Sequence, residues 1–251
     1  MQVLVNNQII SYQVEGSGPV ILLLHGWADS KNTFKPLLKY FTKYKVVALD
    51  LPGFGGSEVP STAWGLNDYA NCIADFLKKI DVDPSKIDTI IGHSNGGAIA
   101  VYGVAESVFS TKKLILLASA GIRTNKTVKK HLLKVIAKTG SAATAVLPSS
   151  YKNRLKSGFY NRIGSDLLIL PYMQQTFKKI VSQDVQKQAS QISVPTLLIY
   201  GSKDTQTPPI YGKILSKKIV NSKLHIIQNE GHFLHQQNTA KVAQIIQEFL
   251  A

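Results

Sequence analysis

A serine stands between two glycines where an apolar stretch of the chain gives way to a helical pattern. The segment Ile90–Gly97 reads Ile-Ile-Gly-His-Ser-Asn-Gly-Gly, which is the sequence form of a nucleophile elbow, a sharp turn from a strand into a helix. Gly92 and Gly96 flank Ser94 because the backbone is crowded in such a turn and often takes positive φ. The residues before the turn read as a short buried strand, and residues 98–105 read as a helix packed on it. This succession constrains the fold more than any other feature of the sequence.

A serine hydroxyl is a weak nucleophile at neutral pH, so it needs a histidine as general base and an acidic residue that orients the histidine. The chain has six histidines. His232 follows the last predicted strand, residues 222–227, in a loop before a terminal helix, which is the place of the base in the chain order serine, acid, histidine. His225 lies inside that strand and His131 inside a basic helical stretch, so structural roles are expected for both.

The acidic partner is expected after another apolar strand. Residues 195–200 form such a run and lead into a loop that carries Asp204. The alternative place is the loop after the strand at 114–117, but that loop reads Ala-Ser-Ala-Gly and has no carboxylate. Asp204 is therefore the predicted acid.

An oxyanion hole requires two backbone N–H groups directed at the charge that develops on a carbonyl oxygen. The strand at 20–24 runs into His25, Gly26 and Trp27, and Gly26 would let this loop turn back toward the serine. The N–H groups of Trp27 and Asn95 are the predicted donors, although an ordinary turn at a strand end explains His25 and Gly26 equally well. His25 and His93 are expected to shape the site through positioning or hydrogen bonds rather than to act as bases.

Together these motifs resemble the α/β-hydrolase superfamily, specifically its small capped esterase-like members. A further match is the strand at 46–49, which is followed by Asp50 and a glycine-rich loop. The resemblance covers most of the chain and implies an α/β fold, with a mostly parallel, doubly wound sheet, a helical cap insertion and a site at the carboxyl ends of the strands. Haloalkane dehalogenases and epoxide hydrolases are similar but use aspartate at the elbow, and Ser94 argues against both. One departure is Gln236-Gln237-Asn238, where members often carry glutamate and proline; it bears on local helix packing.

The length of 251 residues suits one domain with one insertion. Strand and helix signals alternate from Val3 to about Gly121 and resume at Val194. We therefore predict an α/β-hydrolase core at 1–121 and 191–251 and a helical basic cap at 122–190, since a structureless loop of that length is uncommon.

The predicted cap holds most of the chain's excess positive charge. It contains thirteen Lys and Arg residues against two Asp residues, in a chain whose formal net charge is +14. Three interpretations remain open: a solvated lysine-rich face, weak contact of the amphipathic stretch 127–138 with an anionic membrane, or recognition of a carboxylate, phosphate or coenzyme-A group by Arg123, Arg154 and Arg162. No nucleic-acid partner is expected, because no binding motif accompanies the charge.

Other classes of chemistry have weaker support. Cys72 is the only cysteine, so no intramolecular disulfide can form, and we expect it to be buried in a helix. The histidine spacing matches no metal-binding motif, so neither a metal nor another cofactor is expected. The absence of a basic leader and of a long apolar stretch predicts a cytoplasmic protein, while the oligomeric state stays open.

The sequence therefore predicts a serine hydrolase that cleaves a carboxylic ester of a small to medium acyl group through an acyl-enzyme intermediate. Ser94 would attack, His232 would transfer the proton and Asp204 would orient His232. Thioester, lactone or C–C bond hydrolysis on the same apparatus is the first alternative. A ligand-sensing or membrane-associated binding protein with this fold is an alternative from another class.

Overall fold

The computed structural model describes residues 1–123 and 171–251. Within them, eight strands form one sheet in the order β1-β2-β4-β3-β5-β6-β7-β8. β1 and β2, and likewise β2 and β4, pair antiparallel, and the other neighbours are parallel. The predicted mostly parallel α/β sheet is thus confirmed. The strands are β1 (Gln2–Val5), β2 (Gln8–Glu15), β3 (Val20–Leu24), β4 (Lys45–Leu49), β5 (Ile87–His93), β6 (Thr111–Leu117), β7 (Thr196–Gly201) and β8 (Ser222–Ile227).

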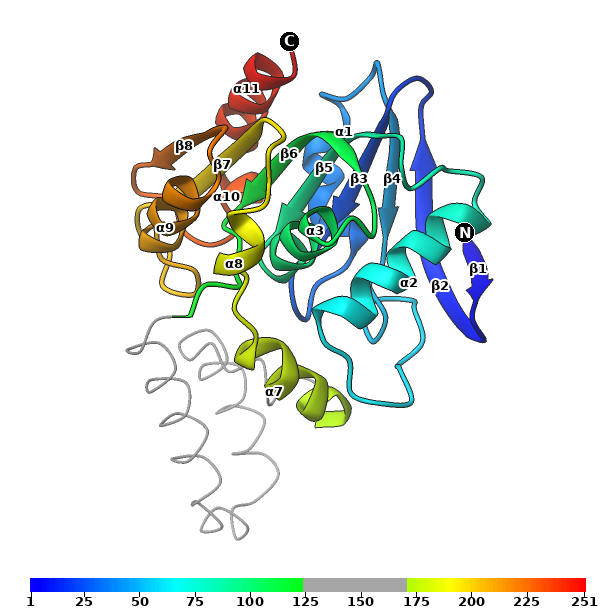
Figure 1. Ribbon diagram of the computed structural model, residues 1–251. Helices are drawn as coiled ribbons and strands as arrows, with labels where there is room; N and C mark the ends of the chain where they lie inside the picture. The colour runs from blue at the N-terminus through cyan, green and yellow to red at the C-terminus, as the bar shows by residue number, and fades with distance from the viewer. Residues whose placement is uncertain (124–170) are drawn as a thin grey trace, which may run out of the picture.

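Helices cover both faces of the sheet (Figure 1). One layer contains α2 (Leu66–Lys79), α3 (Asn95–Ala105), α8 (Gln186–Ala189) and α9 (Ile210–Lys218). The opposite layer contains η1 (Lys31–Phe34), α1 (Lys35–Leu38), α10 (Leu234–Gln237) and α11 (Thr239–Leu250). The sheet is therefore doubly wound, as predicted.

The alternation of side chains along the strands produces two separate hydrophobic cores. In β3, Leu22 and Leu24 belong to the cluster beneath α2 and α3, whereas Ile21 and Leu23 belong to the cluster beneath α1 and α11. All four side chains are fully buried. A strand buried on both faces reads as a continuous apolar run, which is why the sequence marked these strands clearly.

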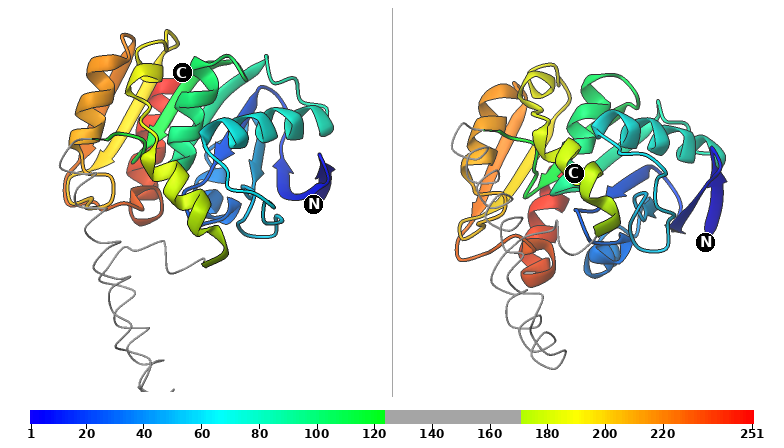
Figure 2. Two further views of the ribbon diagram at one scale, coloured as in Figure 1. Left: turned by 60° about the horizontal axis from the view of Figure 1, so that its bottom comes forward. Right: turned by 90° about the horizontal axis from the view of Figure 1, so that it is seen from below.

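The remaining described helices, η3 (Pro171–Met173) and α7 (Gln174–Ser182), lie beyond one edge of the sheet, outside both helix layers (Figure 2). This is the edge at which β3 ends. Trp27 lies in the loop after β3 and Phe177 lies in α7, and their rings are 5.0 Å apart between centroids. In addition, the N–H of Trp64 donates to Thr176 Oγ1 over 3.1 Å. α7 therefore covers loops that follow the strands.

Both α7 and α8 fall within the predicted cap at 122–190. Val185 and Ala189 are fully buried in the core cluster beneath α2 and α3. The chain at α8 is therefore packed on the α/β core, although it lies within the predicted cap. The greater part of the predicted cap lies outside the described residues, and its boundaries stay a prediction.

Candidate active site

Ser94 lies in a sharp turn between β5 and α3. Its backbone has φ 51° and ψ −115°, and α3 begins at the next residue. A Cβ added at Gly96 would lie 2.1 Å from the carbonyl oxygen of Leu24, and one added at Gly92 would lie 2.6 Å from the Cα of Gly97. Glycine is thus required at both positions by close approach of the backbone. The expectation that these glycines carry the positive φ was wrong, because the strained conformation falls on Ser94 itself.

Three residues with left-handed backbone lie at the ends of neighbouring strands. Ala28 has φ 55° in the loop after β3, Ser94 has φ 51° after β5, and Ala118 has φ 45° after β6. Such conformations cost about 1–2 kcal/mol each for residues with a Cβ. Strained residues of this kind cluster at functional sites in proteins, and here they mark the carboxyl edge of the sheet.

His232 and Asp204 meet at this edge from the loops after β8 and β7. Nδ1 of His232 lies 2.8 Å from Oδ2 of Asp204, and both residues are buried. Oδ1 of Asp204 accepts hydrogen bonds from the backbone N–H groups of Gln206 and Thr207, at 2.8 and 2.9 Å. A carboxylate held in this way fixes the tautomer of neutral His232 with its proton on Nδ1, which leaves Nε2 able to accept a proton.

Thr207 is a member of this cluster that the sequence reasoning missed. Its Oγ1 lies 2.8 Å from Oδ2 of Asp204, 2.8 Å from the carbonyl oxygen of Ala118 and 3.1 Å from Nδ1 of His232. The signal was the spacing Asp-Thr-Gln-Thr, because an aspartate commonly accepts from backbone N–H groups two or three residues later.

His93 connects the elbow to the loop of His232. Nε2 of His93 lies 3.1 Å from the carbonyl oxygen of His232, and the two rings are 4.8 Å apart between centroids. No hydrogen bond joins the Ser94 hydroxyl to His232 in the part of the chain described. In enzymes, hydrogen bonds between catalytic groups often shorten only when substrate binds. The contacts of His93 nevertheless bring the elbow and the loop of His232 close together.

The loop after β3 passes against the elbow. A Cβ at Gly26 would lie 3.1 Å from both the Cβ of Ser94 and Nδ1 of His93. Among the described residues, the backbone N–H groups of Trp27 and Asn95 have no acceptor. The N–H of Asn95 also belongs to the first turn of α3, where the helix dipole favours negative charge.

His25 holds the base of this loop. Its Nδ1 lies 2.7 Å from the carbonyl oxygen of Gly26, and its Nε2 accepts from the N–H of Leu51 over 2.8 Å. Burial lowers the pKa of His25. Both ring nitrogens of His25 are therefore engaged by the backbone, and its positioning role stays a prediction.

His93 also contacts a second histidine, His235, which the sequence analysis did not single out. The rings of His93 and His235 are 4.5 Å apart between centroids, and Nε2 of His235 lies 2.9 Å from Thr33 Oγ1. Burial, reinforced by His232, lowers the pKa of His235 to about 3. Burial also lowers the pKa of His93, with His235 and His232 adding to the effect. Both rings are therefore uncharged at neutral pH.

Of the three arginines predicted to recognise an anion, the structure describes Arg123. Arg123 uses Nη1 and Nη2 to donate to the backbone carbonyls of Ile122 and Ile180, at 3.2 and 3.3 Å. Burial lowers the pKa of its guanidinium. Arg154 and Arg162 lie outside the described residues.

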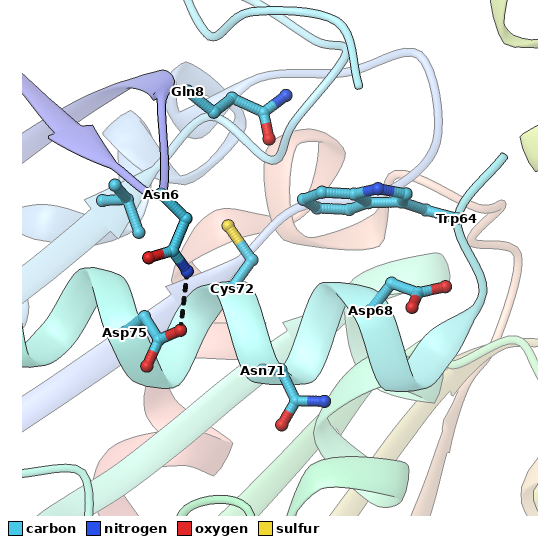
Figure 3. A pocket seen from close by; sticks show the side chains of 8 residues that line it. Asn6, Gln8, Trp64, Asp68, Asn71, Cys72 and Asp75 are labelled. Atoms are coloured by element: carbon cyan, nitrogen blue, oxygen red, sulfur yellow. Dashed lines mark hydrogen bonds between the residues drawn. The ribbon is translucent and has the colours of Figure 1, made fainter. Parts of the chain in front are cut away.

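A separate pocket lies between the β1–β2 turn and α2 (Figure 3). Asp75 in its wall accepts a hydrogen bond from Asn6 over 2.8 Å. Burial, with a contribution from Asp75, raises the pKa of the Cys72 thiol to about 12, so this thiol is not an activated nucleophile. The lining residues are Val5, Asn6, Gln8, Trp64, Asp68, Asn71, Cys72 and Asp75.

Residues 1–123 and 171–251 contain neither a cluster of metal-ligating side chains nor a membrane-spanning helix. No group of three histidine, cysteine or acidic side chains there could hold a metal ion. No helix in these two segments is long and apolar enough to cross a membrane.

Residues 19–239 match the family model of the alpha/beta hydrolase fold. The chain belongs to the α/β-hydrolase family. Among curated members of the family, an uncharacterized protein of Mycobacterium tuberculosis is 26% identical, over 96% of this chain and 77% of its own length. Monoacylglycerol lipase ABHD6 of Rattus norvegicus is also 26% identical, over 94% of this chain and 76% of its own.

A solved structure of an esterase shares the fold of this chain. The esterase from Exiguobacterium antarcticum superposes with a TM-score of 0.78 at 20% identity, covering 99% of this chain and 98% of the esterase. The family assignment predicted from the motifs is confirmed.

Proposed function

We propose that this α/β hydrolase is a serine hydrolase that cleaves carboxylic esters of small to medium acyl groups. The observation that carries the proposal is the buried pair of Asp204 and His232, 2.8 Å apart, at the sheet edge where Ser94 occupies a strained turn. The likeness to proteins named esterase and monoacylglycerol lipase supports an ester as the substrate.

In the proposed reaction, Ser94 Oγ attacks the ester carbonyl carbon while Nε2 of His232 takes the hydroxyl proton. The negative charge on the carbonyl oxygen is stabilised by the N–H groups of Trp27 and Asn95. His232 then gives the proton to the leaving alkoxide, so an alcohol departs and an acyl-enzyme remains. Water attacks this ester with His232 again as base, which releases the acid and restores Ser94.

The first test is covalent labelling of the purified protein with a fluorophosphonate, with the modified peptide located by mass spectrometry. We expect attachment at Ser94, turnover of p-nitrophenyl esters, and loss of both in Ser94→Ala. A Ser94→Ala variant that keeps most of the turnover would show that the mechanism is wrong. A protein that neither labels nor turns over would favour the ligand-sensing alternative.

A further inference from the structure

Asn95 buries an amide that has no hydrogen-bond partner among residues 1–123 and 171–251. The residue is 3% exposed, and both its Nδ2 and its Oδ1 are buried without a partner. Leaving a buried polar group unpaired costs free energy that a hydrophobic residue of similar size would avoid. Native proteins keep few such groups, and each calls for an explanation.

The position of Asn95 relates this amide to the proposed chemistry. Asn95 follows Ser94 directly and is the first residue of α3. Side chains on a helix tilt toward its N-terminus, and this tilt favours an Asn95 amide directed toward the end of α3 that adjoins Ser94. Asn95 also shares a helix face with Ala98, one turn later. A Cβ at Gly121 would lie 3.0 Å from Ala98, so this face is directed at the loop after β6.

Trp27 shows the same feature on the other side of the elbow. Its Nε1 is buried with no hydrogen-bond partner in the described part of the chain, while its ring contacts Phe54 at 4.9 Å and Phe177 at 5.0 Å between centroids. Trp27 and Asn95 are the two residues whose backbone N–H groups are assigned to the oxyanion hole. Each therefore also carries side-chain polar atoms that the protein leaves unpaired.

We propose that these unpaired groups recognise a hydroxyl on the substrate, two or three bonds from the ester group; the inference rests on the proposed function. A hydroxyl accepts from Nδ2 of Asn95 or Nε1 of Trp27 and donates to Oδ1 of Asn95, so it satisfies both kinds of group. A carboxylate can only accept, which leaves Oδ1 unpaired beside a negative charge. A plain alkyl chain satisfies none of the three atoms.

The hydroxyl could belong to the acyl group or to the alcohol, and two pairs of matched esters distinguish these sources. For the acyl side, methyl 3-hydroxybutanoate is compared with methyl 3-methylbutanoate. For the alcohol side, 2-hydroxyethyl butanoate is compared with propyl butanoate. In each pair a methyl group replaces the hydroxyl at similar volume, so the ratio of kcat/KM reports the hydrogen bonds.

We expect the wild-type protein to prefer the hydroxylated ester of one pair by about tenfold or more, because a site built to bind a hydroxyl rejects the analogue without it. In Asn95→Leu, and equally in Asn95→Ala, that ratio should fall to about twofold or less. Asn71→Leu, an exposed asparagine on α2, is the matched control and should keep the wild-type ratio.

A wild-type protein that hydrolyses all four esters without preference would overturn the inference while leaving the proposed function intact. A preference that survives in both Asn95 variants would also overturn it. Fluorophosphonate labelling of each variant reports whether the site is folded. If the wild-type protein neither labels nor hydrolyses any ester, the proposed function fails and this inference fails with it.

Discussion

Thr207 holds the proposed acid and base together, since its hydroxyl lies 2.8 Å from the Asp204 carboxylate and 3.1 Å from Nδ1 of His232. We expect Thr207→Val to lower kcat by about 10-fold to 100-fold, because the carboxylate loses a hydrogen bond and His232 loses its fixed orientation. Steady-state kinetics on a p-nitrophenyl ester measures this change.

Thr207→Ser is the matched control for that experiment. It keeps the hydroxyl and should restore most of the activity, whereas a threonine important only for packing would not be rescued. We also expect the pH profile of kcat/KM to shift in Thr207→Val and not in Thr207→Ser. Equal activity of wild type and Thr207→Val would contradict a positioning role.

Ser94 adopts φ 51°, a conformation that glycine takes without strain. We expect Ser94→Gly to have a free energy of unfolding about 1 kcal/mol higher than Ser94→Ala, because only the glycine variant relieves the strain, less its entropy cost on folding. Urea unfolding of the two inactive variants measures the difference. If Ser94→Ala were as stable as Ser94→Gly, the turn would store no strain at this residue.

At the scale of elements, the elbow depends on how closely α3 approaches the ends of β3 and β5. We expect Gly96→Ala to lower the free energy of unfolding by about 3 kcal/mol or more, because its Cβ would collide with the carbonyl oxygen of Leu24 at 2.1 Å. Gly231→Ala is the matched control. Its Cβ meets only the end of Gln237, at 3.7 Å, and its stability should stay close to that of the wild type.

The six parallel strands were predictable because each carries an apolar segment that the sequence shows clearly. β3 and β7 are apolar runs buried on both faces, β5 carries the buried pair Ile90 and Ile91, and each of these strands leads into a loop with a chemically distinctive residue. The three predicted site residues Ser94, Asp204 and His232 could be placed at one edge because the carboxyl ends of parallel strands meet there.

The features that could not be predicted from the sequence depend on contacts between distant segments. Thr207 and His235 gain their surroundings only when loops after different strands pack together. The unpaired amide of Asn95 is likewise invisible in sequence, since pairing is a property of the whole environment. The same reason explains why the conformational strain was assigned to the glycines when Ser94 carries it.

At the scale of the whole molecule, three of the buried histidines in residues 1–123 and 171–251 couple stability to pH. Burial lowers the pKa of His25, His93 and His235, so they stay neutral in the folded protein while the unfolded chain protonates them below about pH 6.5. Their contribution to stability is complete above that pH and is lost progressively as the pH falls toward the folded-state pKa, about 3 for His235. The pKa of Asp50 is lowered because hydrogen bonds from Gly56 and Lys31 outweigh its burial, so it affects stability only in more acidic solution.

We therefore expect the free energy of unfolding to fall between pH 7 and pH 5, by about 2 kcal/mol for His235 and further for His25 and His93, whose pKa values are also lowered. Urea unfolding at the two pH values measures this fall. In His235→Asn, the fall should be smaller by about 2 kcal/mol, the contribution of His235. His225→Asn replaces a half-buried histidine in β8 and should leave most of the fall in place. If His235→Asn showed the full wild-type fall, His235 would have to carry its proton in the folded state, and the uncharged ring contact with His93 would not exist.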